Sequence, residues 1–144
     1  MTSFPASPAL ITLAADAATW YWDFDDDGRI DIYVANDAYA NHLWLNQGDG
    51  TFFDDALILG AAFNQQGMAE AGMGIVSADF DGDLDLDLFM THLDRETNTL
   101  YRNLGPAGWQ DDTAAAGLGP AGLPFTGFGT AFLDADHDGD LDLA

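Results

Sequence analysis

Short apolar runs divide the chain into its predicted elements. GTAFL at residues 129–133 is a compact apolar run, and LDLFMT at residues 86–91 is another. TLYRN at residues 99–103 alternates apolar and polar positions, and Trp109 begins a further short segment. Clusters of Gly, Asn and Asp separate these runs. Short runs bounded by turn residues predict β-strands joined by tight turns.

The same pattern recurs along the chain. Three segments align without gaps, and their first aspartates lie about 55 residues apart: WDFDDDGRIDI from Trp22, ADFDGDLDLDL from Ala78 and LDADHDGDLDL from Leu133. The flanking segments repeat as well, since NHLWLNQGDGTFFDD from Asn41 matches NTLYRNLGPAGWQDD from Asn98. Four short strands in each repeat are typical of a propeller blade.

We therefore predict an all-β fold built from β-propeller blades, each a four-stranded antiparallel sheet. The repeats place the first blade at residues 16–71, the second at 72–126 and a truncated third at 127–144. For residues 1–15, a strand of a preceding blade is one interpretation. An internally duplicated β-sandwich is the alternative architecture, although sandwiches rarely keep one acidic loop at a fixed place in each repeat.

About two and a half blades cannot form a closed ring, because propellers generally need four to eight. We therefore expect the chain to be a fragment or one part of an assembly. Its expected partners are the remaining blades of the same propeller or further copies of itself.

Each repeat carries an acidic loop with the spacing of a cation site. In the third loop, positions 1, 3, 5, 7 and 9 are all aspartate: Asp134, Asp136, Asp138, Asp140 and Asp142. Alternate carboxylates converge when the chain turns, Gly139 at position 6 permits a positive φ, and position 7 can offer its carbonyl. Hard oxygen ligands in a flexible loop suit Ca²⁺ better than Mg²⁺.

The second loop departs from the pattern at one position. Its acidic residues are in place at the same five positions: Asp79, Asp81, Asp83, Asp85 and Asp87. Leu84, however, stands where the other loops have glycine, and a left-handed conformation there costs roughly 1–2 kcal/mol. Gly82 offers a way to relocate the turn. We expect this site to be the weakest.

The acidic loops admit two other interpretations. Aspartates can serve as turn residues with no bound ion, but three copies in register disfavour this. The D-x-D-x-D-G string also begins an EF-hand loop, which needs flanking helices and a glutamate at position 12. That position is Val34 in the first loop and Met90 in the second, so the EF-hand is rejected.

The charge of the chain agrees with cation binding and excludes some partners. There are 25 acidic residues and three basic ones, for a net charge of -22, and all but Glu70 and Glu96 of the acids are Asp. Nucleic acid and anionic membranes need basic residues, so neither is an expected partner. The chain has no cysteine, no apolar run of membrane-spanning length, and no basic stretch typical of a signal peptide in its first twenty residues.

These motifs resemble a known family. The loops resemble the calcium loops of FG-GAP and VCBS repeats of integrin α-like propellers, and the Gly-x-Gly of GMG at 72 and GFG at 127 is similar to the start of that family's strands. NHLWLNQGDGTFFDDA and DRETNTLYRNLG look like bacterial relatives of cartilage acidic protein, which often carry an ASPIC/UnbV domain.

The resemblance implies a seven- or eight-bladed propeller of exported or surface-bound proteins, with structural Ca²⁺ held by positions 1, 3, 5, 7 and 9. By position, the ligands of the first loop are Asp23, Asp25, Asp27, Arg29 (through its carbonyl) and Asp31. Up to three Ca²⁺ ions are expected in this chain.

The expected function is a calcium-stabilised extracellular interaction or adhesion scaffold that recognises a protein or glycan and is not an enzyme. The chain lacks the common catalytic motifs, and His42, His92 and His137 share no ligand spacing and are expected at the surface. The alternative is a propeller-based carbohydrate-binding protein or polysaccharide-active enzyme.

Overall fold

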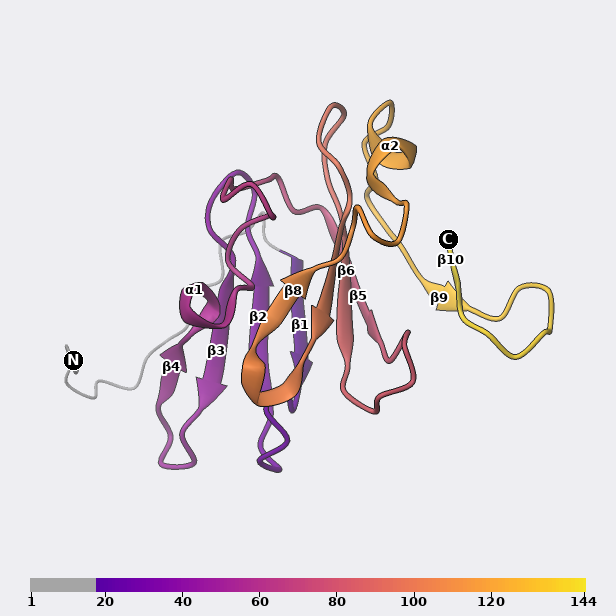
Figure 1. Cartoon of the computed structure of the whole chain (residues 1–144). Helices are drawn as coiled ribbons and strands as arrows, with labels where there is room; N and C mark the ends of the chain where they lie inside the picture. Colours follow the sequence, from indigo (N-terminus) through magenta and orange to yellow (C-terminus); the bar gives the residue numbers. More distant parts are fainter. Residues whose placement is uncertain (1–17) are drawn as a thin grey trace.

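The computed structural model describes residues 18–144 (Figure 1). The segment at residues 1–15, interpreted above as a strand of a preceding blade, lies outside the described residues. Within residues 18–144, the helical segments are short pieces between β-strands. None of the helices in that range is long and apolar enough to cross a membrane.

The first repeat forms a four-stranded antiparallel sheet whose strands follow one another in chain order. Its strands are β1 (Ala18–Trp22), β2 (Asp31–Ala35), β3 (His42–Asn46) and β4 (Phe52–Asp54). The helix α1 (Ala56–Leu59) follows and ends at Gly60, whose φ of 85° is left-handed. Consecutive strands with tight turns between them make this sheet a simple meander.

The second repeat forms the same sheet. Its strands are β5 (Gly74–Ala78), β6 (Asp87–Thr91), β7 (Thr99–Asn103) and β8 (Trp109–Asp111). A 3-10 turn, η1 (Gly105–Ala107), joins β7 to β8, and α2 (Gly119–Gly122) follows β8. The pairing of Tyr101 with Asp111 repeats that of Trp44 with Asp54, so the two sheets share one register.

The third repeat is a hairpin of β9 (Phe132–Leu133) and β10 (Asp142–Leu143). Strand β5 lies beside β1 of the preceding sheet and beside β9 of the following hairpin, as the first strands of neighbouring blades do. The fold is therefore all-β and built of propeller blades, as predicted, and not a duplicated sandwich.

The hydrophobic core fills the space between the first two sheets. Its buried apolar residues come from both repeats and from the segment between them: Phe24, Tyr33, Ala35, Leu43, Ala56, Ala61, Ala62, Leu88, Met90, Tyr101 and Trp109. The hydroxyl of Tyr33 donates a hydrogen bond of 2.8 Å to the carbonyl of Ala61, so this buried phenol is paired. One blade thus supplies the packing surface of the next.

The first glycine of the repeated Gly-x-Gly lies in close contact with the neighbouring blade. A Cβ at Gly72 would lie 2.9 Å from the Cβ of Ala35, and one at Gly127 would lie 2.7 Å from the Cβ of Thr91. Ala35 and Thr91 are the last residues of β2 and β6, so the two contacts are equivalent. Glycine is required here because there is no room for a side chain.

Candidate metal loops

The three acidic loops occupy the same place in each repeat. Each joins the first strand of its sheet to the second, at residues 23–30, 79–86 and 134–141. Figure 1 shows the β1–β2 and β5–β6 loops at the same end of the two sheets. The fold therefore aligns equivalent aspartates in neighbouring blades.

Two positions of every loop have a positive φ. At position 4 the residues are Asp26, Gly82 and His137, with φ of 59°, 81° and 63°. At position 6 they are Gly28, Leu84 and Gly139, with φ of 84°, 81° and 96°. The expected left-handed conformation of Leu84 is confirmed, whereas the idea that Gly82 relocates the turn is wrong, because all three loops share one shape.

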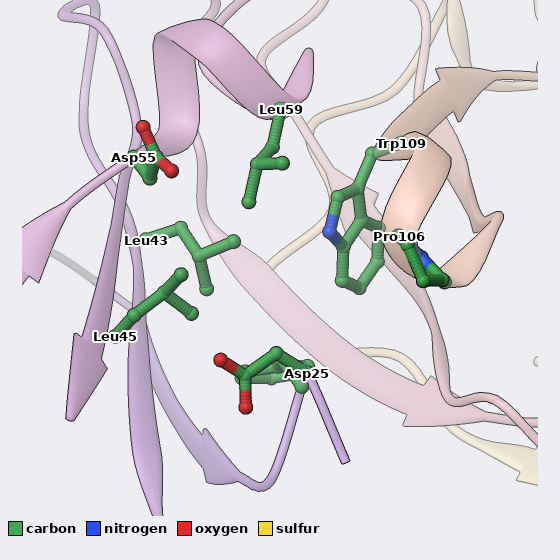
Figure 2. Close-up of a pocket in the computed structure, with 9 residues that line it drawn as sticks. Asp25, Leu43, Leu45, Asp55, Leu59, Pro106 and Trp109 are labelled. Carbon is green, nitrogen blue, oxygen red and sulfur yellow. The ribbon is translucent and has the colours of Figure 1, made fainter. Parts of the chain in front are cut away.

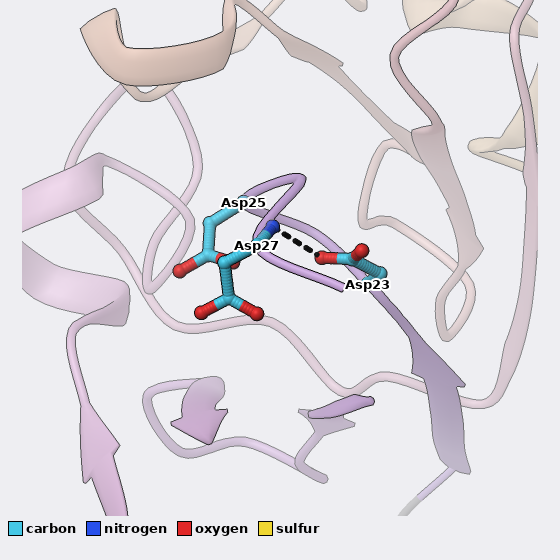
Figure 3. A group of neighbouring side chains, drawn as sticks. All are labelled: Asp23, Asp25 and Asp27. Atoms are coloured by element: carbon cyan, nitrogen blue, oxygen red, sulfur yellow. Dashed lines mark hydrogen bonds between the residues drawn. The ribbon is translucent and has the colours of Figure 1, made fainter. Parts of the chain in front are cut away.

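The carboxylate at position 1 holds each loop in that shape. Asp23 Oδ1 accepts the amide of Asp27 at 3.1 Å (Figure 3). Its Oδ2 accepts the amide of Gly28 at 2.8 Å. Asp79 and Asp134 accept the equivalent two amides in their own loops. The side chain that begins the loop therefore also closes it.

The side chains at position 5 continue this pattern. Asp27 Oδ1 accepts the amide of Arg29, and Asp83 and Asp138 accept the equivalent amides at position 7. The near-exclusive use of Asp already indicated short carboxylates held close to their own backbone in a turn, and these contacts show that role at position 5. Such Asx turns explain why Asp, and not Glu, is used in the loops.

Carboxylates converge in each loop, although in two different combinations. Ligand atoms within 4.8 Å of one another come from Asp23, Asp25 and Asp27 in the first loop. In the second and third loops the groups combine positions 1, 3 and 9: Asp79, Asp81 and Asp87, and Asp134, Asp136 and Asp142. Among the predicted carboxylate ligands, Asp31, Asp83 and Asp138 are outside these groups, and Asp85 and Asp140 at position 7 are expected to bind through their carbonyls.

The aspartate at position 9 ties the loop to the sheet. Asp87 is fully buried, and its oxygens accept the amides of Phe80 at 3.0 Å and Asn103 at 2.8 Å. Asp31 does the same with Phe24 and Asn46. Burial raises the pKa of Asp87 to about 6 and, in the same direction, that of Asp31, while the donated hydrogen bonds oppose the shift.

Burial and repulsion between neighbouring carboxylates raise the pKa of aspartates within the loops. Burial raises the pKa of Asp25, and the neighbouring Asp31 and Asp23 raise it further. Burial, Asp83 and Asp26 raise the pKa of Asp85, so the first and second loops also influence each other. Carboxylates this close repel by about 1 kcal/mol per pair even in water.

Two arginines contact the loop carboxylates. Arg29, whose carbonyl is the predicted ligand at position 7 of the first loop, forms an ion pair through its side chain with Asp27. In the second loop, Arg102 Nη1 lies 3.6 Å from Asp81 Oδ2, and Arg102 Nε lies 3.0 Å from Asp112 Oδ2. These contacts of Arg102 were not predicted from the sequence. The repeat alignment showed only that Arg102 stands at the position that Leu45 occupies in the first repeat.

The residues present fit a hard divalent cation. Each loop offers at least three carboxylate oxygens in close proximity, and no softer nitrogen or sulfur ligand belongs to the groups found among residues 18–144. Oxygen-only ligands are what Ca²⁺ and Mg²⁺ prefer, and a flexible loop favours the larger ion.

A second group of titratable residues was missed, and it corrects one expectation. His92 was expected at the surface, but only 2% of it is exposed. Its Nε2 lies 3.7 Å from Glu70, whose carboxylate accepts a hydrogen bond of 2.8 Å from the Thr99 hydroxyl. The amide of Ala71 donates to Glu96 nearby. Through these contacts, the segment that connects the two blades (Glu70 and Ala71) packs against the β6–β7 connection and the start of β7.

Comparison with known proteins agrees with this arrangement. The family model of the FG-GAP-like repeat matches the chain twice, at residues 23–90 and 79–144. The two matches begin at Asp23 and Asp79, the first residues of the first two loops. A search of curated proteins finds no match. Because the repeat matches span most of the chain, this protein belongs to the FG-GAP-like repeat family.

Proposed function

We propose that the three loops bind Ca²⁺ and that the bound ions stabilise an extracellular interaction or adhesion scaffold. The observation that carries this proposal is the hydrogen-bond pattern shared by all three loops, in which Asp23, Asp79 and Asp134 each accept the amides of positions 5 and 6. Because the same hydrogen-bond pattern recurs in register, we infer that all three loops bind the same kind of ion.

The proposed ligands are the residues at positions 1, 3, 5, 7 and 9 of each loop, with the carbonyl used at position 7. Bound Ca²⁺ would supply positive charge where the carboxylates repel one another. The chain's own residues fix each loop to its sheet. Asp31 accepts a hydrogen bond from the amide of Asn46 in β3, and Asp87 accepts one from the amide of Asn103 in β7. A cation would therefore strengthen the blade and not take part in a reaction.

We also propose finer assignments, some by resemblance to the family and others from the repeats. FG-GAP repeats are typically extracellular structural and adhesion repeats, so we place the protein outside the cell or on its surface and assign it a protein or glycan partner and no catalytic role. We propose blade boundaries at residues 16–71, 72–126 and 127–144, and bacterial proteins with an ASPIC/UnbV domain as relatives.

Isothermal titration of the chain with CaCl₂ after chelator treatment tests the metal proposal. The expected result is two strong sites and a weaker third, and MgCl₂ should bind more weakly at every site. The combined variant Asp23→Asn, Asp79→Asn, Asp134→Asn should lose all binding, whereas Asp37→Asn, an exposed acid outside the loops, should not. No heat of binding at millimolar Ca²⁺ would refute the proposal.

A further inference from the structure

A small pocket lies between the first blade and the β7–β8 turn of the second (Figure 2). It has a volume of about 220 Å³. Its walls are mostly apolar, and two of its lining residues, Asp25 and Asp55, carry carboxylates. The other lining residues are Phe24, Leu43, Leu45, Leu59, Gly105, Pro106 and Trp109. Figure 2 shows Leu43 and Leu59 facing Trp109 across the space, with Asp55 and Asp25 at opposite ends of it in this view.

The second repeat shows what its own residues do at the equivalent place. The shared sheet register makes Asp25 equivalent to Asp81, Leu45 to Arg102, and Asp55 to Asp112. In the second repeat Arg102 lies between the two acids, 3.0 Å from Asp112 and 3.6 Å from Asp81. The guanidinium thus joins the metal loop to the end of the fourth strand.

The first repeat keeps both acids but lacks the arginine. Leu45 is too short and apolar to reach between Asp25 and Asp55. Among residues 18–144, no side chain or backbone amide of another residue donates a hydrogen bond to either carboxylate. The pocket therefore presents two acids at positions that, in the sister repeat, bind a guanidinium.

We propose that this pocket is a docking site for an arginine side chain of a partner protein. The apolar walls suit the methylene stem of arginine, and a guanidinium stacks favourably on an indole such as that of Trp109. Asp25 and Asp55 would form ion pairs with it, as Asp81 and Asp112 do with Arg102.

Size and charge select this occupant over others. Pockets for drug-sized ligands measure about 300–1,000 Å³, so this one suits a single side chain. The net charge of -22 attracts a basic partner over a distance and raises its association rate. Asp55 is outside the metal loops, and Asp25, although a proposed Ca²⁺ ligand, can share its carboxylate with a guanidinium, as Asp81 does with Arg102.

The test uses a capped Gly-Arg-Gly peptide and the whole chain in CaCl₂, with binding followed through the NMR signal of the Trp109 indole N–H. Matched peptides with citrulline, which keeps the shape but not the charge, and with lysine serve as probes. The arginine peptide should bind at least about tenfold more tightly than either, as expected for charge-assisted paired hydrogen bonds.

Two variants locate the site. Asp55→Asn should weaken arginine binding about tenfold, whereas Asp37→Asn, which changes the net charge equally, should not. Leu45→Arg should abolish peptide binding by filling the pocket from within, and should raise the melting temperature as an internal ion pair forms. Equal binding of the citrulline or lysine peptide, or undiminished binding to Leu45→Arg, would overturn the proposal. Calcium titration of the same samples tests Ca²⁺ binding by the loops separately from binding of the arginine peptide.

Discussion

Leu84 holds the backbone conformation of Gly28, with a φ of 81° against 84°. The two residues stand at position 6 of neighbouring loops, and the amide of each donates to the first aspartate of its loop. The backbone of a leucine therefore adopts a left-handed conformation that ordinarily favours glycine. The residue is 86% exposed, so no packing compensates for the strain.

Relief of this strain should strengthen the second loop. We predict that Leu84→Gly tightens Ca²⁺ binding at that site and raises the free energy of unfolding by about 1 kcal/mol. Leu84→Ala is the matched control, because it removes the exposed side chain but keeps the Cβ that causes the strain. Equal gains from the two variants, measured by calcium titration and denaturant unfolding, would show that exposure and not backbone strain is the cause.

Calcium removal should destabilise the whole chain. Three bound Ca²⁺ would change the net charge of -22 by six units. A ligand at ten times its dissociation constant adds roughly 1.4 kcal/mol per site, so three sites add about 4 kcal/mol. We expect a poorly folded or oligomeric chain in EDTA and a cooperative transition in several millimolar CaCl₂, measured by circular dichroism. Identical melting curves of a monomeric sample would contradict this.

Acid should weaken the junction between the blades. Burial lowers the pKa of His92, although the charges of Glu70, Glu96 and Asp111 oppose the shift. The unfolded chain takes up a proton near the ordinary histidine pKa of about 6.5, before the folded chain does, so stability falls as pH drops below that value.

His92→Gln should reduce this pH dependence between pH 7 and 5.5. Denaturant unfolding at a series of pH values in CaCl₂ measures it, and His137→Gln, at an exposed position, is the control. If the slope of stability against pH is the same in His92→Gln as in the parent chain, the histidine is not responsible.

Blade packing should depend on the first glycine of the Gly-x-Gly. Gly72→Ala would place its new methyl 2.9 Å from the Cβ of Ala35. Such overpacking costs about 1–3 kcal/mol. Gly129→Ala is the matched control, since a Cβ there would meet no atom within 4 Å. Thermal unfolding in CaCl₂ should show a larger loss of stability in Gly72→Ala than in Gly129→Ala. An equal loss would show that backbone entropy, and not contact between the blades, causes the effect.

Local patterns were enough to predict the fold. Three strands of the second sheet, such as Thr99–Asn103, were visible as short runs between turn residues, and the first strand followed from the equivalent run GTAFL of the third repeat. The left-handed residue at position 6 followed from Gly28 and Gly139. These features depend on neighbouring residues along the chain.

Features that depend on contacts between repeats were harder to predict. His92 looked like a surface histidine because nothing local showed that Glu70, 22 positions earlier, would cover it. Asp87 looked like a simple ligand, although it also accepts the amide of Asn103 from another strand. Asp27 joins the carboxylate group of its loop whereas Asp83, at the same position, does not, and the shared sequence pattern could not distinguish them.

The placement of all three acidic loops at strand-one to strand-two turns has an evolutionary consequence. The opposite end of the blades carries the connections NDAYAN at residues 36–41 and HLDRETN at residues 92–98, which differ in sequence and length although the sheets around them match. Mutations at their exposed positions, such as Tyr39 and Arg95, leave the cation loops untouched, whereas His92 and Glu96 hold the junction between the blades. A lineage can therefore diversify the exposed positions at one end of such a protein while the cation loops at the other end remain constant, and an engineer can vary the same positions.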